Sequence, residues 1–146
     1  MKDWSKKRYW IVGASEGLGL ALAQKMSEAG ASLILTARNE ARLKEIASTL
    51  PNEVEVLPLD ITDLNAVRKS VKNLKNVDGF VFLAGAYWPM PAQHWDIEKL
   101  TAMIDVNLIG ALHTLDVILP IFLEKNRGHL VFTGSLRSEE HTSELQ

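Results

Sequence analysis

Residues 9–30, YWIVGASEGLGLALAQKMSEAG, join a short apolar run to an amphipathic segment through three closely spaced glycines. The run at 9–12 has the length and the aromatic and β-branched content of a buried strand. Residues 18–29 carry apolar side chains at helical spacing, and the pattern stops at Gly30, a common helix end. A strand that enters a helix through a glycine-rich turn predicts a βα unit at the start of the chain.

The same alternation of strand and helix patterns continues outward from this unit. The expected strands are 9–12, 32–36, 54–57, 79–83 and 130–132. The expected helices are 18–29, 40–50, 63–74, 97–106 and 108–123. We expect Thr62 to cap the third helix and Pro120 to interrupt the last one.

These strands are continuous apolar runs, as in parallel sheets that helices cover on both faces. Right-handed crossovers then give a doubly wound, Rossmann-like α/β fold. We predict a parallel sheet of about five strands in the order 3-2-1-4-5, with ligands bound at the carboxyl ends of its strands.

Composition narrows the class of protein. The chain has 146 residues, of which 47% are hydrophobic and 23% charged, with a net charge of -2, which favours one globular domain and disfavours nucleic-acid binding. It contains no cysteine, which excludes disulfides. No signal peptide is recognisable, and we expect no stretch near the roughly 18 apolar residues of a membrane span. We therefore predict a cytoplasmic protein without nucleic-acid or membrane partners.

The glycine turn at 13–19, GASEGLG, has the features of a diphosphate-binding loop. Glycine lets backbone N–H groups approach a phosphate closely, and the following helix directs its positive end at the ligand. The spacing is Gly-x-x-x-Gly-x-Gly rather than the more common Gly-x-Gly-x-x-Gly. An ordinary glycine-rich turn is the alternative interpretation.

Four motifs in order make residues 8–136 resemble the short-chain dehydrogenase/reductase family. GASEGLG at 13–19 resembles its cofactor loop, and LDITD at 59–63 its adenine-side segment. VNLIGALH at 106–113 resembles the helix that carries an asparagine, and GHLVFTGS at 128–135 the strand that carries a serine. The resemblance implies an NAD(P)-binding Rossmann domain over residues 1–136.

The resemblance implies hydride transfer between a nicotinamide and a small carbonyl or alcohol. Catalytic roles fall on Ser135, which orients the substrate oxygen, and on Asn107, which holds a water in the proton relay. A strand-end turn serine and a helix-kink or capping asparagine are the alternatives. No metal site is expected. The implied cofactor-binding residues are Gly13, Ser15, Glu16, Gly17, Leu18, Gly19, Arg38, Asp60, Ile61, Ala84 and Gly85.

The residues after the second strand bear on the choice of cofactor. An acidic residue there would accept hydrogen bonds from the ribose 2′-OH of NAD(H), and none is present. Arg38 can instead hold a 2′-phosphate, which favours NADP(H) and leaves NAD(H) possible. Glu16 in the glycine loop opposes this choice by repelling a phosphate. A surface ion pair between Arg38 and Glu40 is the alternative role for the arginine.

Two features depart from the family pattern. Phe82-Leu83 stands where Asn-Asn is common, which removes side-chain hydrogen bonds that brace the sheet. The family's Tyr-x-x-x-Lys pair is expected about a dozen residues after Ser135. Tyr9 and Tyr87 are the only tyrosines, and neither is followed by lysine at the fourth place.

Residues 137–146, RSEEHTSELQ, match the translation of a widely used sequencing adapter. We therefore expect a non-native tail, with 1–136 an incomplete domain that is inactive alone; a natural acidic tail is the alternative. The long helix at 108–123 implies a homo-oligomer by resemblance, and His113 is expected on a helix surface or against a partner. A dinucleotide-binding sensor or scaffold without turnover is the alternative function.

Overall fold

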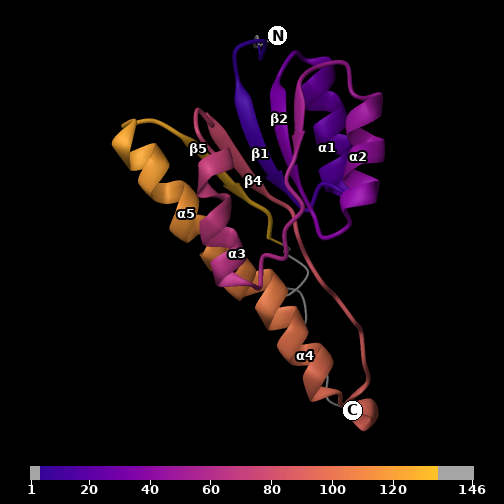
Figure 1. Ribbon diagram of the computed structural model, residues 1–146. Coiled ribbons are helices and arrows are strands. Elements are labelled where there is room, and N and C mark those ends of the chain that lie inside the picture. Colours follow the sequence, from indigo (N-terminus) through magenta and orange to yellow (C-terminus); the bar gives the residue numbers. More distant parts are fainter. Residues whose placement is uncertain (1–3, 135–146) are drawn as a thin grey trace.

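A computed structural model describes residues 4–134 and shows one parallel sheet in the order β3-β2-β1-β4-β5, as the sequence predicts (Figure 1). All four strand pairs are parallel, so the carboxyl ends of the strands meet at one edge. The strands are β1 (Arg8–Val12), β2 (Ser32–Thr36), β3 (Val54–Val56), β4 (Gly79–Phe82) and β5 (His129–Phe132).

Successive residues of the central strand β1 enter two different cores. Trp10 and Val12 pack in one core with residues of α3 (Leu64–Lys69) and α5 (Gly110–Glu124). Tyr9 and Ile11 pack in the other with α1 (Gly17–Glu28) and α2 (Glu40–Thr49). A strand covered on both faces has no polar positions, which explains why it reads as a continuous apolar run.

The start of α3 differs from the sequence prediction. The cap is Asp63, whose carboxylate accepts a hydrogen bond of 3.0 Å from the backbone N–H of Ala66, and the prediction of Thr62 is wrong. Thr62 instead donates through its backbone N–H and its hydroxyl to Asp60, at 2.9 and 2.8 Å. The helix ends at Lys69 and continues as a 3-10 turn, η1 (Ser70–Asn73).

A single long helix replaces the two that the sequence predicts. The helix α4 (Ile97–Ile104) runs through a π-helical turn, η3 (Asp105–Ile109), directly into α5. Figure 1 shows the α4 half extending beyond the sheet. The predicted interruption at Pro120 is also wrong, because this proline lies inside α5. Its neighbours Ile118 and Phe122 are buried in the core, and their packing offsets the hydrogen bond that proline cannot donate.

The continuous helix Ile97–Glu124 has 28 residues and is apolar enough to cross a membrane by length and composition. The expectation that no stretch reaches this length is therefore wrong. One such helix is weak evidence for a membrane, since core helices of globular proteins pass the same test. Here the helix lies along the sheet and buries Val117, Ile118 and Phe122 against it.

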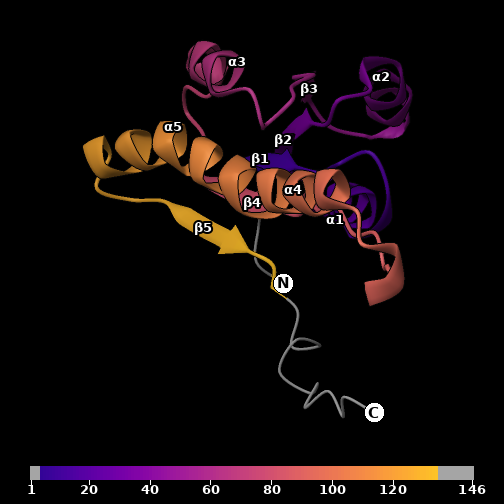
Figure 2. The same ribbon diagram turned by 90° about the horizontal axis from the view of Figure 1, so that it is seen from below.

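The strand β5 forms one edge of the sheet, with α5 running beside it (Figure 2). Phe132 stacks on Phe82, with ring centroids 5.8 Å apart and an interplanar angle of 29°. Phe82 is itself buried in the core. Apolar packing thus takes the place of the side-chain hydrogen bonds expected from the asparagines that are common at this position.

Candidate functional site

A cavity of about 890 Å³ opens among the loops that follow β1, β2, β3 and β4. These loops lie at the carboxyl ends of parallel strands, where doubly wound sheets bind ligands. The structure brings all eleven predicted cofactor-binding residues into its lining: Gly13, Ser15, Glu16, Gly17, Leu18, Gly19, Arg38, Asp60, Ile61, Ala84 and Gly85.

The glycines of the first loop are required by close backbone contacts. Gly13 has a φ of +89°, and a Cβ there would lie 2.5 Å from the backbone nitrogen of Ala84. A Cβ on Gly19 would lie 1.9 Å from the carbonyl oxygen of Gly13. Both distances are far below van der Waals contact. The glycines therefore let β1 turn beneath the end of β4 and let α1 begin directly on that turn.

The first turn of α1 is suited to an anion. Glu16 occupies the N-cap position in extended conformation, and its side chain makes no capping hydrogen bond. The first turn contains no acidic residue, and Gly17 and Leu18 line the cavity. The leading backbone N–H groups of a helix lack intrahelical partners and carry partial positive charge. A phosphate is the ligand that such a helix end favours.

Arg38 lies at the mouth of the cavity without an ion-pair partner. It is exposed, and it forms no salt bridge with any residue in the described range 4–134. Glu40 pairs with Lys44 at 2.7 Å, so the alternative pairing of Arg38 with Glu40 is not formed. The guanidinium is thus available to a ligand in the cavity.

Asp60 lines the same cavity, and its surroundings favour the ionised form of its carboxyl group. The backbone N–H of Thr62 is the largest cause that holds the pKa of Asp60 below its ordinary value of 3.8. The Thr62 hydroxyl and the positive charge of Arg38 act in the same direction, while partial burial opposes them. Asp60 therefore stays ionised at neutral pH and can accept hydrogen bonds.

Sequence reasoning missed the role of Arg42 beside the glycine loop. Its Nε donates to the carbonyl oxygen of Ser15 at 3.4 Å, and its Nη1 pairs with Glu45 at 2.7 Å. Asn39 caps α2 by accepting from the backbone N–H of Arg42 at 3.0 Å. The available signal was a second arginine one helical turn after Arg38.

Asn107 lies in the π turn and holds the loop after β4. Its Oδ1 accepts from the backbone N–H of Ala86 at 2.8 Å, and its Nδ2 donates to the Ala86 carbonyl at 2.9 Å. Asn107 does not itself line the cavity. The side-chain amide therefore fixes one wall, and a role in proton transfer stays a prediction. Ser135 and residues 137–146 lie outside the described residues.

His113 does not lie where the sequence reasoning placed it. Its Nδ1 lies 2.9 Å from the carbonyl oxygen of Ile61, a residue that lines the cavity. The expectation of a surface or partner-facing histidine is wrong, because the side chain turns inward from α5.

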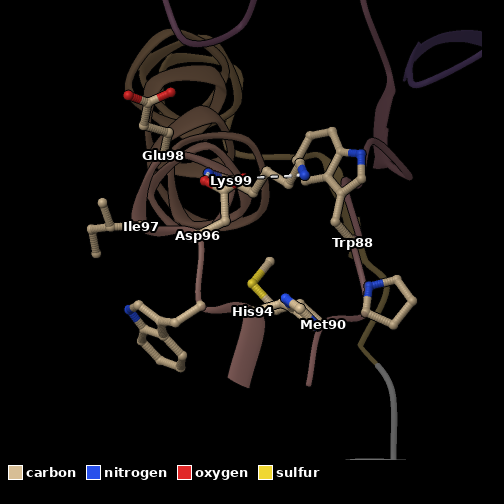
Figure 3. A pocket seen from close by; sticks show the side chains of 9 residues that line it. Trp88, Met90, His94, Asp96, Ile97, Glu98 and Lys99 are labelled. Carbon is tan, nitrogen blue, oxygen red and sulfur yellow. Dashed lines mark hydrogen bonds and ion pairs between the residues drawn. The ribbon is translucent and has the colours of Figure 1, made fainter. Parts of the chain in front are cut away.

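An aromatic loop after β4 borders the cavity. Tyr87 and Trp88 line it, and Trp88 also lines a second pocket of about 600 Å³ at the start of α4 (Figure 3). In that pocket Lys99 pairs with Asp96 at 3.1 Å. Tyr87 is 78% exposed, so the loop extends beside the opening instead of packing over the sheet. Among residues 4–134 no cluster of histidine and acidic side chains could hold a metal ion.

Comparison with known proteins identifies the family. Residues 7–145 match the family described as short chain dehydrogenase, and the chain belongs to this family. An uncharacterized oxidoreductase of Staphylococcus epidermidis is 35% identical over 136 residues, which are 90% of this chain and 59% of that protein. One from Staphylococcus saprophyticus is 32% identical over 140 residues, covering 90% of this chain and 60% of that protein.

Solved structures agree with the fold. A serine dehydrogenase from Escherichia coli superposes with a TM-score of 0.86 at 27% identity, covering 92% of this chain and 64% of that one. A short chain dehydrogenase from Bacillus anthracis gives 0.86 at 19% identity, covering 94% of this chain and 60% of that one. The chain therefore spans about 60% of the length of these proteins.

Proposed function

We propose that the protein is an NADP(H)-dependent oxidoreductase that moves a hydride between the nicotinamide and a small carbonyl or alcohol. Bound NADP(H) supplies or accepts the hydride, and the residues described here bind and orient it. In this proposal the backbone N–H groups of the 13–19 turn and the start of α1 hold the diphosphate. The oxidoreductase names of the relatives support this class of reaction and do not favour a non-catalytic sensor or scaffold.

The observation that carries the cofactor choice is the unpaired Arg38 at the cavity. Its planar guanidinium can hold a 2′-phosphate through two hydrogen bonds. No acidic residue occupies the end of β2, where one would select the 2′-OH of NAD(H). Glu16 also lines the cavity, but its exposed side chain is free to turn toward solvent and away from a phosphate. We propose NADP(H) as the preferred cofactor and NAD(H) as a weaker one.

The other walls fit the remaining parts of the cofactor. We propose that Asp60 accepts a hydrogen bond from the adenine and that Ile61 flanks the adenine as an apolar side chain. Ala84 and Gly85 leave room for close approach of the cofactor beside β4. The exposed rings of Tyr87 and Trp88 offer an apolar border for a small substrate.

For catalysis we propose that Ser135 orients the substrate oxygen and that Asn107 supports the proton relay by fixing the loop at Ala86. A tyrosine with a lysine four places later would supply the proton, because a nearby cation favours the phenolate. We further propose that the adapter-like residues 137–146 are not native. Sequencing the gene from its natural source tests this, with a reading frame that departs from RSEEHTSELQ after Leu136 as the expected result.

We also propose a cytoplasmic homo-oligomer. One face of the long helix exposes apolar side chains at helical spacing, among them Ile104, Leu108 and Leu112. Such a stripe suits pairing with a second copy. Sedimentation of the full-length protein should give a species larger than a monomer.

The test of the function is a titration of the full-length protein with NADPH and NADH, followed by hydride transfer to a panel of small aldehydes and ketones. We expect tighter binding of NADPH and consumption of NADPH with at least one carbonyl. If neither NADPH nor NADH binds, the proposal is overturned. The sensor would be favoured if the nucleotide binds but the protein neither reduces any carbonyl of the panel nor oxidises the corresponding alcohols.

A further inference from the structure

One face of the long helix contacts two of the loops that line the cavity. Asn107, Gly110 and His113 follow one another at intervals of three residues across the junction of η3 and α5. Asn107 holds the loop after β4 through Ala86. Gly110 and His113 contact Ile61, in the loop after β3.

The wall at Ile61 is fixed through both its backbone and its side chain. The carbonyl oxygen lies 2.9 Å from Nδ1 of His113. The side chain packs directly over Gly110, where a Cβ would lie 2.7 Å from both Cγ1 and Cδ1 of Ile61. Ile61 is 7% exposed and belongs to the core that α5 forms with the sheet. Gly110 therefore contacts the side chain of Ile61, and His113 contacts its backbone carbonyl.

The position of Ile61 determines where Asp60 stands. The two residues are consecutive, and both line the cavity. The Asp60 carboxylate is held by Thr62 on the other side of Ile61, at 2.9 Å from the backbone N–H and 2.8 Å from the hydroxyl. Within residues 4–134, His113 is the only side chain that contacts the Ile61 carbonyl oxygen at hydrogen-bond distance. A shift of the Ile61 backbone would carry the carboxylate with it.

We propose that His113 is a positioning residue for the adenine-side wall of the cofactor cavity. A carbonyl oxygen only accepts hydrogen bonds, so Nδ1 of His113 carries the proton and donates it to Ile61. This contact fixes the backbone of Ile61 and, through it, the position of the Asp60 carboxylate. The inference rests on the proposed function, because it takes the ligand of the cavity to be a nicotinamide dinucleotide.

The test compares ligands that contain only the adenosine end of the cofactor. Affinities of 5′-AMP and adenosine 2′,5′-bisphosphate are measured by competition against NADPH on the full-length protein. His113→Leu removes the donor and should weaken both ligands by a similar factor of about tenfold, the order expected of one hydrogen bond. His113→Asn places an amide N–H near the position of Nδ1 and should restore most of that loss.

Three controls separate positioning from folding. Arg38→Ala should weaken adenosine 2′,5′-bisphosphate more than 5′-AMP, unlike His113→Leu. His129→Leu removes a histidine hydrogen bond at the opposite end of the sheet and should lower the melting temperature without changing either affinity. If His113→Leu does not fold, His113→Gln, whose amide lies beyond the Nδ1 position, should show the same loss.

The outcomes distinguish this inference from the proposed function. If the unaltered protein binds no nucleotide, the proposed function fails and the inference falls with it. If the unaltered protein binds both ligands and the leucine or glutamine variant binds them equally well, only the role of His113 is overturned. Equal loss in the asparagine and leucine variants would also overturn the role of the Nδ1 donor.

Discussion

Tyr9 and His129 lie on strands that are not neighbours, yet a hydrogen bond of 3.0 Å joins the phenol oxygen to Nδ1. Between them lies Gly79 of β4, which is in register with both residues. A Cβ on Gly79 would lie 2.1 Å from Cε1 of Tyr9, so only glycine lets the ring cross the middle strand. Burial and the charge of Asp78 raise the pKa of Tyr9, which keeps the phenol protonated.

Gly79→Ala should displace the Tyr9 ring and loosen β5. We expect a loss of about 1–3 kcal/mol in the free energy of unfolding, the usual cost of overpacking. Tyr9→Phe is the matched control, because it deletes only the hydroxyl and should cost about 1 kcal/mol. Urea unfolding measures both variants. An alanine variant as stable as the parent would mean that the ring can cross β4 in another way.

Arg38→Asp should reverse the choice of cofactor. The new carboxylate repels a 2′-phosphate and can accept hydrogen bonds from a 2′-OH, so NADP(H) affinity should fall far more than NAD(H) affinity. The loss for NADP(H) should be at least about tenfold, or 1.4 kcal/mol. Fluorescence titration with both reduced nucleotides gives the ratio. Equal losses for the two would contradict the assignment of Arg38.

Gly13→Ala and Gly17→Ala should separate folding from binding. A Cβ on Gly13 meets the backbone of Ala84 at 2.5 Å, so its variant should lose about 3 kcal/mol of stability together with binding. Gly17 has a φ of +53° and no atom within 4 Å of an added Cβ. Its variant should cost about 1–2 kcal/mol from backbone strain. Because Gly17 lines the cavity, NADPH affinity should still fall, and an unchanged affinity would remove the phosphate from this turn.

The lowered pKa of Asp60 predicts the pH dependence of one contribution to stability. A depressed folded-state pKa stabilises the fold above the ordinary value of 3.8, and this contribution is lost as pH falls through the lower folded value. Because Asp60 is exposed, the effect should be small. Unfolding of the parent and of Asp60→Asn between about pH 5 and pH 2 should show a shallower decline for the asparagine variant. Parallel curves would count against it.

Local patterns predicted the central strands because β1, β2 and β4 are buried on both faces and must be apolar throughout. They also brought the glycine turn, Arg38 and Asp60 to one edge, since parallel strands end together. The contact of His113 with Ile61 joins residues 52 positions apart, and no local pattern encodes it. Thr62 and Asp63 are both acceptable caps, and only the turn at Asp60 decides between them.

The π turn at 105–109 carries one residue more than a regular α-helical path would need. A π turn accommodates this extra residue as a local widening of the helix. Removing one residue there would let a regular α-helix form, and the side chains of the turn would take new directions, at about 100° per residue. Asn107 lies in this turn, so its amide would no longer be directed at Ala86. The extra residue thus sets the direction of Asn107, and a one-residue deletion there should release the loop after β4 more than most substitutions in the turn.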